Sequence, residues 1–283
     1  MSQELIVPTA GIHHGIAAEV YHSWNAVSHS WLNRLHQSPA HLADLIENGG
    51  IESTPDQVFG SAVHCIVLEP DEFPHRYAVR TEGVSGVTKA GKEFAAMAEG
   101  AGMTILSATD GRWVEAVARR ARFNARLSEW LHRKHETEVS LVWERDGYLC
   151  KARADLMVSG LNIIADLKTT TTGSAAGFAR QVARFNYHAQ AAWYLDGIQR
   201  LTGQVWDWWF VVAEKRRPFL VNCQAVPRDS VAHRAGVEQN DELFALYKRC
   251  NETGKWPGYE DVDEIQLPDW SIGESIAEEA FGD

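Results

Sequence analysis

The sequence predicts an α/β (α+β) domain in which helices flank a central mixed β-sheet. Three observations predict this fold class. Apolar residues recur at helical spacing in the first half of the chain, a β-rich centre follows with a hairpin signal at Asp146-Gly147, and helices and strands alternate after it. The chain has 283 residues, of which 45% are hydrophobic, so it can bury a sizeable core.

Helices dominate the expected first half. Ser28 or Ser30 can cap the first helix, Pro39 interrupts it, and Pro70 ends the second. The expected elements are helices over 28–48, 56–69, 89–99 and 110–133, a short strand over 75–80 and a loop over 83–88.

The second half alternates strands and helices, which indicates a sheet covered by helices. The expected strands cover 137–143, 148–157, 161–168, 205–213 and 217–224, and the expected helices cover 174–185, 187–201 and 228–250. We therefore expect one domain over 1–256, followed by an acidic tail over 257–283.

Counting outward from the hairpin at Asp146-Gly147 predicts which acids face each other. A two-residue turn pairs Arg145 with Tyr148 and places Glu138 opposite Asp155. Side chains alternate between the two faces of a sheet, so this register decides which residues share a face.

The next turn leaves two registers open. A two-residue turn at Ser159-Gly160 places Asp155 opposite Ile164, whereas a four-residue turn over 159–162 places Asp155 directly opposite Asp166. Both even lengths keep the two acids on one face, at cross-strand distances of roughly 5 to 8 Å.

Lys168 has the same parity as Asp166, so three acids and a lysine gather on one face of the predicted meander. Crowded carboxylates repel one another unless a cation lies among them, and hard oxygen ligands suit Mg²⁺ or Mn²⁺. The alternative is a solvated sheet face on which Lys168 pairs surface acids. Against it, Asp166 follows the apolar run Ile163-Ile164-Ala165, which is typical of a central strand.

Charge is unevenly distributed along the chain. The net charge is −11, but the tail over 257–283 holds nine acids and no Lys or Arg, so the remainder carries only −2. Residues 111–134 hold seven bases and two acids, and such a helix could follow phosphates. The alternative is an ordinary solvated helix face.

Several function classes are excluded by what the sequence lacks. The four cysteines are scattered without a C-x-x-C pair, which excludes a zinc ribbon and an iron–sulfur cluster. No G-x-x-x-x-G-K-[ST] motif is present, so we expect no need for ATP. We see no membrane-spanning run and no signal peptide, and we expect a cytoplasmic protein.

An ordered set of motifs resembles the PD-(D/E)XK nucleases. Asp155 followed by Asp166-Leu167-Lys168 resembles their D…(D/E)-x-K signature. Gly60 to His64 resembles the G-x-x-x-H helix of the RecB-like branch, and Gln190 to Tyr194 resembles its Q-x-x-x-Y helix. Residues 28–39 resemble the opening of the exonuclease VIII (RecE) nuclease domain and its phage relatives, and the whole resemblance covers roughly 20–225.

The resemblance implies a PD-(D/E)XK, restriction-endonuclease-like core and a role for each motif residue. His64, Asp155 and Asp166 would be metal ligands together with the Leu167 carbonyl, and Glu138 matches an upstream acid whose role as a ligand is less secure. Lys168 would orient or polarise the attacking water.

The last helix motif is implied to contact DNA or to brace the site. Gln190 and Tyr194 lie four residues apart and share a helix face, with Tyr187 nearby. Each has a plainer alternative, since Gln190 could be merely exposed and the two tyrosines merely core residues. His64, taken alone, also fits a core histidine.

The resemblance further implies an Mg²⁺-dependent exodeoxyribonuclease with one or two ions, acting on linear double-stranded DNA, 5′–3′, in recombination or phage DNA processing. DNA is its expected partner, with a single-strand annealing or recombinase protein and a ring-shaped homo-oligomer as further expectations. Two alternatives stay open: a RecB-like endonuclease or single-strand nuclease, and a non-catalytic DNA-binding or inhibitory protein.

Overall fold

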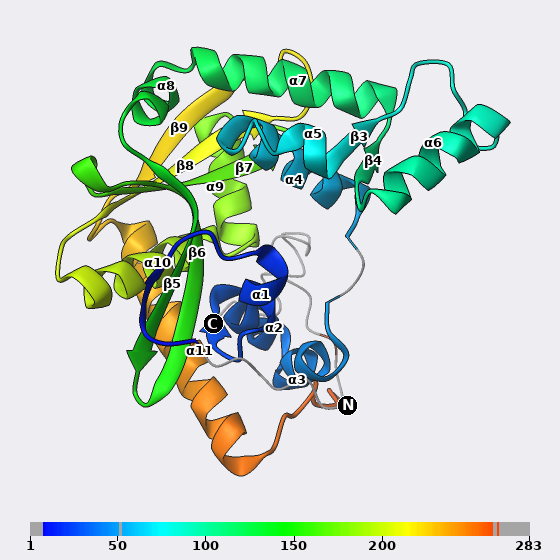
Figure 1. Cartoon of the computed structure of the whole chain (residues 1–283). Helices are drawn as coiled ribbons and strands as arrows, with labels where there is room; N and C mark the ends of the chain where they lie inside the picture. The colour runs from blue at the N-terminus through cyan, green and yellow to red at the C-terminus, as the bar shows by residue number, and fades with distance from the viewer. Residues whose placement is uncertain (1–7, 51–52, 263–264, 266–283) are drawn as a thin grey trace, which may run out of the picture.

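A mixed seven-stranded sheet forms the centre of the protein, which confirms the predicted fold class (Figure 1). The computed structural model describes residues 8–50, 53–262 and 265. Most of the predicted acidic tail, from residue 266 onward, lies outside these residues. No helix in the described part of the chain is both long enough and apolar enough to cross a bilayer.

Six strands of the sheet lie in the order β1-β5-β6-β7-β8-β9, and β2 pairs with β6 alongside them. The β5–β6–β7 meander and the β8–β9 pair are antiparallel, whereas β7 and β8 are parallel. The strands are β1 (Gly11–His13), β2 (Val27–Ser28), β5 (Glu136–Arg145), β6 (Tyr148–Val158), β7 (Ile163–Thr170), β8 (Asp207–Glu214) and β9 (Val221–Val226). A separate parallel pair joins β3 (Tyr77–Val79) and β4 (Thr104–Leu106).

Helices cover both faces of the sheet, and the two larger hydrophobic cores of the described residues contain them. One core contains α2 (His29–Gln37), α10 (Tyr187–Thr202) and α11 (Val231–Thr253), and the other contains α4 (Pro55–Leu68), α7 (Ala108–Phe123) and α8 (Ala125–His132). In Figure 1, α7 runs along the upper edge of the molecule next to α4. The remaining helices are α1 (Ala18–Ser23), α3 (Pro39–Asn48), α5 (Phe73–Arg76), α6 (Lys89–Gly100) and α9 (Ala175–Arg184).

Local signals account for most helix boundaries. Ser28 caps α2, and Ser38 caps α3 where Pro39 breaks the predicted helix. The single helix predicted over 110–133 is wrong in one respect: it is two helices. Asn124 ends α7 and accepts a hydrogen bond from the Leu127 N–H, which starts α8.

The β6–β7 connection resolves the register that the sequence left open. Ser159–Leu161 form a 3₁₀ turn and Asn162 adopts a left-handed φ of 51°, so the connection spans four residues. The two-residue turn is therefore wrong and the four-residue turn is confirmed. A left-handed residue closes the turn, and Asn accepts that conformation more readily than most residues.

Other short elements escaped the sequence analysis. These are β1, β2, β4, α1 and α5, which have two to six residues each. The strand predicted over 217–224 begins later, at Val221, because 215–220 form the β8–β9 connection. Runs this short carry too few residues to show a period.

Gly197 is the position at which α10 comes closest to the sheet. A Cβ on Gly197 would lie 2.6 Å from the Trp143 side chain, which is buried against Trp193 and cannot move aside. We expect Gly197→Ala to lower the free energy of unfolding by roughly 1–3 kcal/mol, measured by urea denaturation.

Gly160→Ala is the matched control, since a Cβ there meets nothing within 4 Å. It should change the free energy of unfolding by less than about 0.5 kcal/mol. Equal stability of the two variants would contradict the close contact.

Candidate active site

Asp155 and Asp166 face each other where strands β6 and β7 separate. The two strands pair as far as Leu156 and Ala165, and the same register places the two acids opposite each other one residue further on. Beyond that point the Leu167 N–H donates to the Asp155 carboxylate at 2.8 Å. The acids therefore lie at a fork in the sheet, where a ligand can approach them.

Glu138 lies on the other neighbour of β6, at the position opposite Asp155. The β5–β6 register runs from Arg145 and Tyr148 through Val139 and Ala154, as the hairpin count predicted. Glu138 itself adopts a left-handed φ of 53°, which costs a non-glycine residue on the order of 1 kcal/mol. Such strain at a charged residue is typical of a functional position.

The helix α4 brings His64 to the fork. A Cβ on Gly60 would lie 3.2 Å from Thr169 Oγ1, so Gly60 lets the helix lie close to β7. One turn later His64 faces the same way, with Nδ1 3.3 Å from Asp155 Oδ2 and Nε2 2.5 Å from the Leu167 carbonyl oxygen. The four-residue spacing of Gly60 and His64 therefore places a close helix–strand contact and the imidazole on the same face of α4.

Asp166 is almost fully buried on the central strand β7, where it exposes 2% of its surface. The Gln190 side chain donates to Oδ1 at 2.7 Å, and the Lys168 ammonium lies 2.6 Å from Oδ2. Gln190 is therefore not an exposed side chain but a direct partner of the acid. Lys168 in turn lies 4.6 Å above the Tyr187 ring.

Tyr194 lies one turn of α10 beyond Gln190 and packs edge-on against Trp208 at 5.2 Å. It also lines a cavity together with Asp155 and Gln190. Burial raises its pKa well above the ordinary value, so the phenol is neutral. Both the core role and the bracing role suggested by the sequence are compatible with this place.

The acids in the fork repel one another. Burial, followed by the charges of Asp166 and Glu138, raises the pKa of Asp155 to about 7, although His64 and Lys168 oppose the shift. Burial lowers the pKa of Lys168, but the carboxylates of Asp166 and Asp155 outweigh it and raise that pKa overall. A positive charge among the carboxylates would relieve this repulsion.

The residues at the fork fit a divalent cation. His64, Glu138 and Asp155 each offer a ligand atom, and these atoms lie within 4.8 Å of one another. Asp166 adds a buried Oδ2, and the Lys168 ammonium lies 2.6 Å from it. Carboxylate oxygens with one imidazole suit Mg²⁺ or Mn²⁺.

Asp166 is not part of that three-residue group, and its oxygens lie against Lys168 and Gln190. Its role as a ligand, like those of His64, Asp155 and the Leu167 carbonyl, stays a prediction.

Two cavities reach the fork, and the ion pair between Arg153 and Glu138 lines both. Arg153 Nε lies 2.6 Å from Glu138 Oε2, and both residues line each cavity. A cavity of about 520 Å³ includes His64, and one of about 360 Å³ includes Asp155. Glu138 therefore borders both cavities, whereas Asp155 borders only the smaller one.

Arg153 and Lys151 are two further charged residues of the site, and no role was predicted for either from the sequence. Lys151 is buried and donates to the carbonyls of Tyr21 and Trp24 at 2.9 and 2.7 Å, and burial lowers its pKa to about 8. The signal was present in Lys151-Ala-Arg-Ala-Asp155, where charged residues occupy every second position of a central strand. Such a run points to one polar face inside the protein.

The mixed sheet, its fork and the acid–lysine cluster define a PDDEXK-like domain. Residues 28–268 match the family described as "PDDEXK-like domain of unknown function (DUF3799)", and the chain belongs to that family. The resemblance noted in the sequence is thereby confirmed at the level of family and fold. Membership of this family supports the interpretation of the chain as a nuclease.

A solved structure shares this fold. A crystal structure from Eubacterium rectale, described as that of a "putative exonuclease", matches with a TM-score of 0.62 and 14% identity. The match covers 95% of this chain and 100% of that one, and at this identity it shows the fold alone. The structure of SSO0001 has a TM-score of 0.30 at 14% identity and covers 48% of this chain and 68% of that one, a similarity too low to show a shared fold. No curated protein matches the chain.

The crowded acids predict a stability effect that needs no activity assay. An acid with a raised pKa destabilises the fold in full above that pKa, and the cost disappears as pH falls towards the ordinary value. At mildly alkaline pH in EDTA, we expect Asp155→Asn to raise the free energy of unfolding by about 2 kcal/mol.

Saturating Mg²⁺ should reverse this order, because an ion that binds only the folded wild type stabilises it. Urea denaturation with EDTA and with Mg²⁺ measures both effects. A wild type unaffected by Mg²⁺ would contradict metal binding at the fork.

Proposed function

We propose that this chain is a metal-dependent, ATP-independent exonuclease that hydrolyses phosphodiester bonds of linear double-stranded DNA. One observation carries the proposal: Asp155, Asp166 and Lys168 meet at the fork of the sheet, with Glu138 and His64 beside them. Buried acids held together against their repulsion favour a catalytic site over a structural one.

Mg²⁺ is the proposed cofactor, as one or two ions, and Mn²⁺ can substitute. His64, Asp155, Asp166 and the Leu167 carbonyl would hold it, with Glu138 as a further acid beside them. When bound, the metal supplies positive charge that neutralises developing phosphate charge and lowers the pKa of water.

Lys168 is proposed to orient the attacking water and to add a fixed positive charge. Its raised pKa keeps the ammonium charged, and the Tyr187 ring beneath it limits where the ammonium can lie. Gln190 holds Asp166 in one orientation through a hydrogen bond of 2.7 Å. Tyr194 is proposed to brace α10 at the same place or to contact DNA.

Finer properties follow from the resemblance and are part of the same proposal. These are 5′–3′ polarity, a role in recombination or phage DNA processing, a single-strand annealing or recombinase partner, a ring-shaped homo-oligomer and a place in the cytoplasm. The proposed nuclease domain covers 1–256, and the acidic segment over 257–283 is proposed as a separate tail.

Two substitutions test the chemistry. Lys168→Ala and Asp166→Asn should each lower Mg²⁺-dependent degradation of end-labelled linear duplex by at least about a hundredfold, because each removes a charge at the reacting phosphate. Asp166→Asn keeps an oxygen for Gln190, so the fold should persist, as circular dichroism can check.

Lys89→Ala is the matched control, since Lys89 is exposed on α6 and, within the described part of the chain, pairs only with Glu93. It should degrade DNA like the wild type. Full activity in either site variant would refute the assignment of the fork.

A comparison of substrates separates the exonuclease from its rivals. Linear duplex should disappear in Mg²⁺ and persist in EDTA, while covalently closed circular DNA stays intact. Cleavage of the circle would favour an endonuclease, and preference for single strands would favour a single-strand nuclease. Binding without cleavage, independent of metal, would favour a non-catalytic DNA-binding or inhibitory protein.

A further inference from the structure

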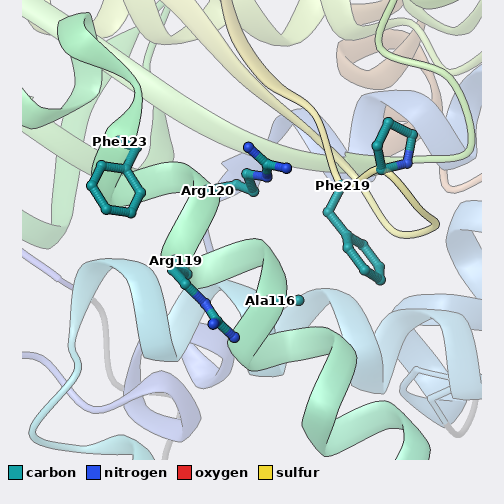
Figure 2. A pocket seen from close by; sticks show the side chains of 6 residues that line it. Ala116, Arg119, Arg120, Phe123 and Phe219 are labelled. Atoms are coloured by element: carbon teal, nitrogen blue, oxygen red, sulfur yellow. The ribbon is translucent and has the colours of Figure 1, made fainter.

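A basic aromatic groove lies on the outer side of α7, apart from the fork. It is formed by Ala116, Arg119, Arg120 and Phe123 of α7 and by Pro218 and Phe219 of the β8–β9 connection (Figure 2). The hollow has a volume of about 270 Å³. None of these residues belongs to the acid–lysine cluster.

Phe123 is 80% exposed at the last residue of α7, although phenylalanine is usually buried. The surrounding helix does not need it for packing, because α7 buries its opposite side through Val114, Val117 and Ala121. The exposed Phe123 ring beside the hollow can therefore stack on a planar group of a ligand.

Arg119 and Arg120 line the same groove as the Phe123 ring. Arg119 and Arg120 contact no carboxylate among the described residues, and neither do Arg216 and Arg217 in the connection. By contrast, Arg112 on the same helix pairs with Glu82 at 2.7 Å. The groove therefore presents positive charge that the described part of the protein does not neutralise, which favours an anionic partner.

One ring contact and one ion pair hold the β8–β9 connection against the neighbouring helices. Phe219 is 8% exposed and its ring lies 6.2 Å from that of Trp113 on α7. Lys215 Nζ pairs with Asp56 of α4 at 2.7 Å, which fixes the connection to the helix that carries His64. Asp56 and His64 are eight residues apart, about 12 Å along the helix axis, so α4 contacts the connection near its start and carries His64 further along.

We propose that the basic aromatic groove binds single-stranded nucleic acid, with the arginines against successive phosphates and a base stacked on Phe123. Alternating positive charge and an exposed ring form the usual platform for unpaired bases, whereas bases stacked inside a duplex cannot reach such a ring. Binding of single-stranded nucleic acid by the groove does not require cleavage at the fork. Only its use, as a track for the strand left by digestion, rests on the proposed function.

The test measures binding of fluorescein-labelled oligo(dT) by anisotropy in EDTA, where no cleavage occurs. Arg119→Gln/Arg120→Gln should raise Kd at least about tenfold and lower the slope of log Kd against log salt by about 1.4, since each single-strand phosphate contact contributes about 0.7. Arg249→Gln is the matched control, because Arg249 is exposed on α11 and unpaired among the described residues. It should change Kd by less than about twofold.

Phe123 variants separate stacking from simple apolar contact. Phe123→Leu should raise Kd by about tenfold, as expected for the loss of one stacked base, and Phe123→Trp should restore or tighten binding. Ultraviolet crosslinking to oligo(dT) should place the crosslink on the peptide that contains Phe123.

Three outcomes would overturn the proposal. The first is unchanged binding in the double arginine variant. The second is a duplex of equal length that binds as tightly and ignores Phe123→Leu. The third is tighter binding of an acidic peptide with the sequence of 257–283 at the same arginines, which would make the groove a peptide site. A failed nuclease assay with intact oligo(dT) binding would refute the proposed function and leave the groove standing.

Discussion

The structure depends on a fork in its central sheet at which buried carboxylates are forced together. Asp155 and Asp166 occupy opposed positions just where β6 and β7 stop pairing, and the side chain of Asp155 accepts the Leu167 N–H that a neighbouring strand would otherwise take. The acid thus serves the backbone as well as the site. Burial and mutual repulsion raise its pKa to about 7. The ionised carboxylate therefore destabilises the fold, and a bound cation would remove this destabilisation.

Partners from distant elements keep that charge in place. His64 comes from α4, Gln190 from α10, and Lys168 from β7 itself, and each faces one of the two acids. Because these elements belong to the two cores on either side of the sheet, the site is supported from both faces. A catalytic group held between rigid layers keeps its orientation better than one on a loop.

Local rules were enough to predict the fold class and much of the site. The hairpin at Asp146-Gly147 set the β5–β6 register, and alternation then placed Glu138 opposite Asp155. Helix ends were predicted where a proline or serine acts locally, as at Ser38 and Pro39. The helix end at Asn124 was not predicted. A polar residue within a helical pattern becomes a cap only when the following helix changes direction to pack elsewhere.

The sequence by itself determined the order of the elements, the faces of the strands and the set of charged residues that share one side of the meander. These properties depend on neighbours a few positions apart, which backbone geometry relates directly. Tertiary structure alone decided the four-residue turn that opposes Asp155 to Asp166, the approach of His64 across 103 positions, and the pairing of Arg153 with Glu138. Those contacts arise only when packed layers bring distant segments together, and no local period encodes that distance.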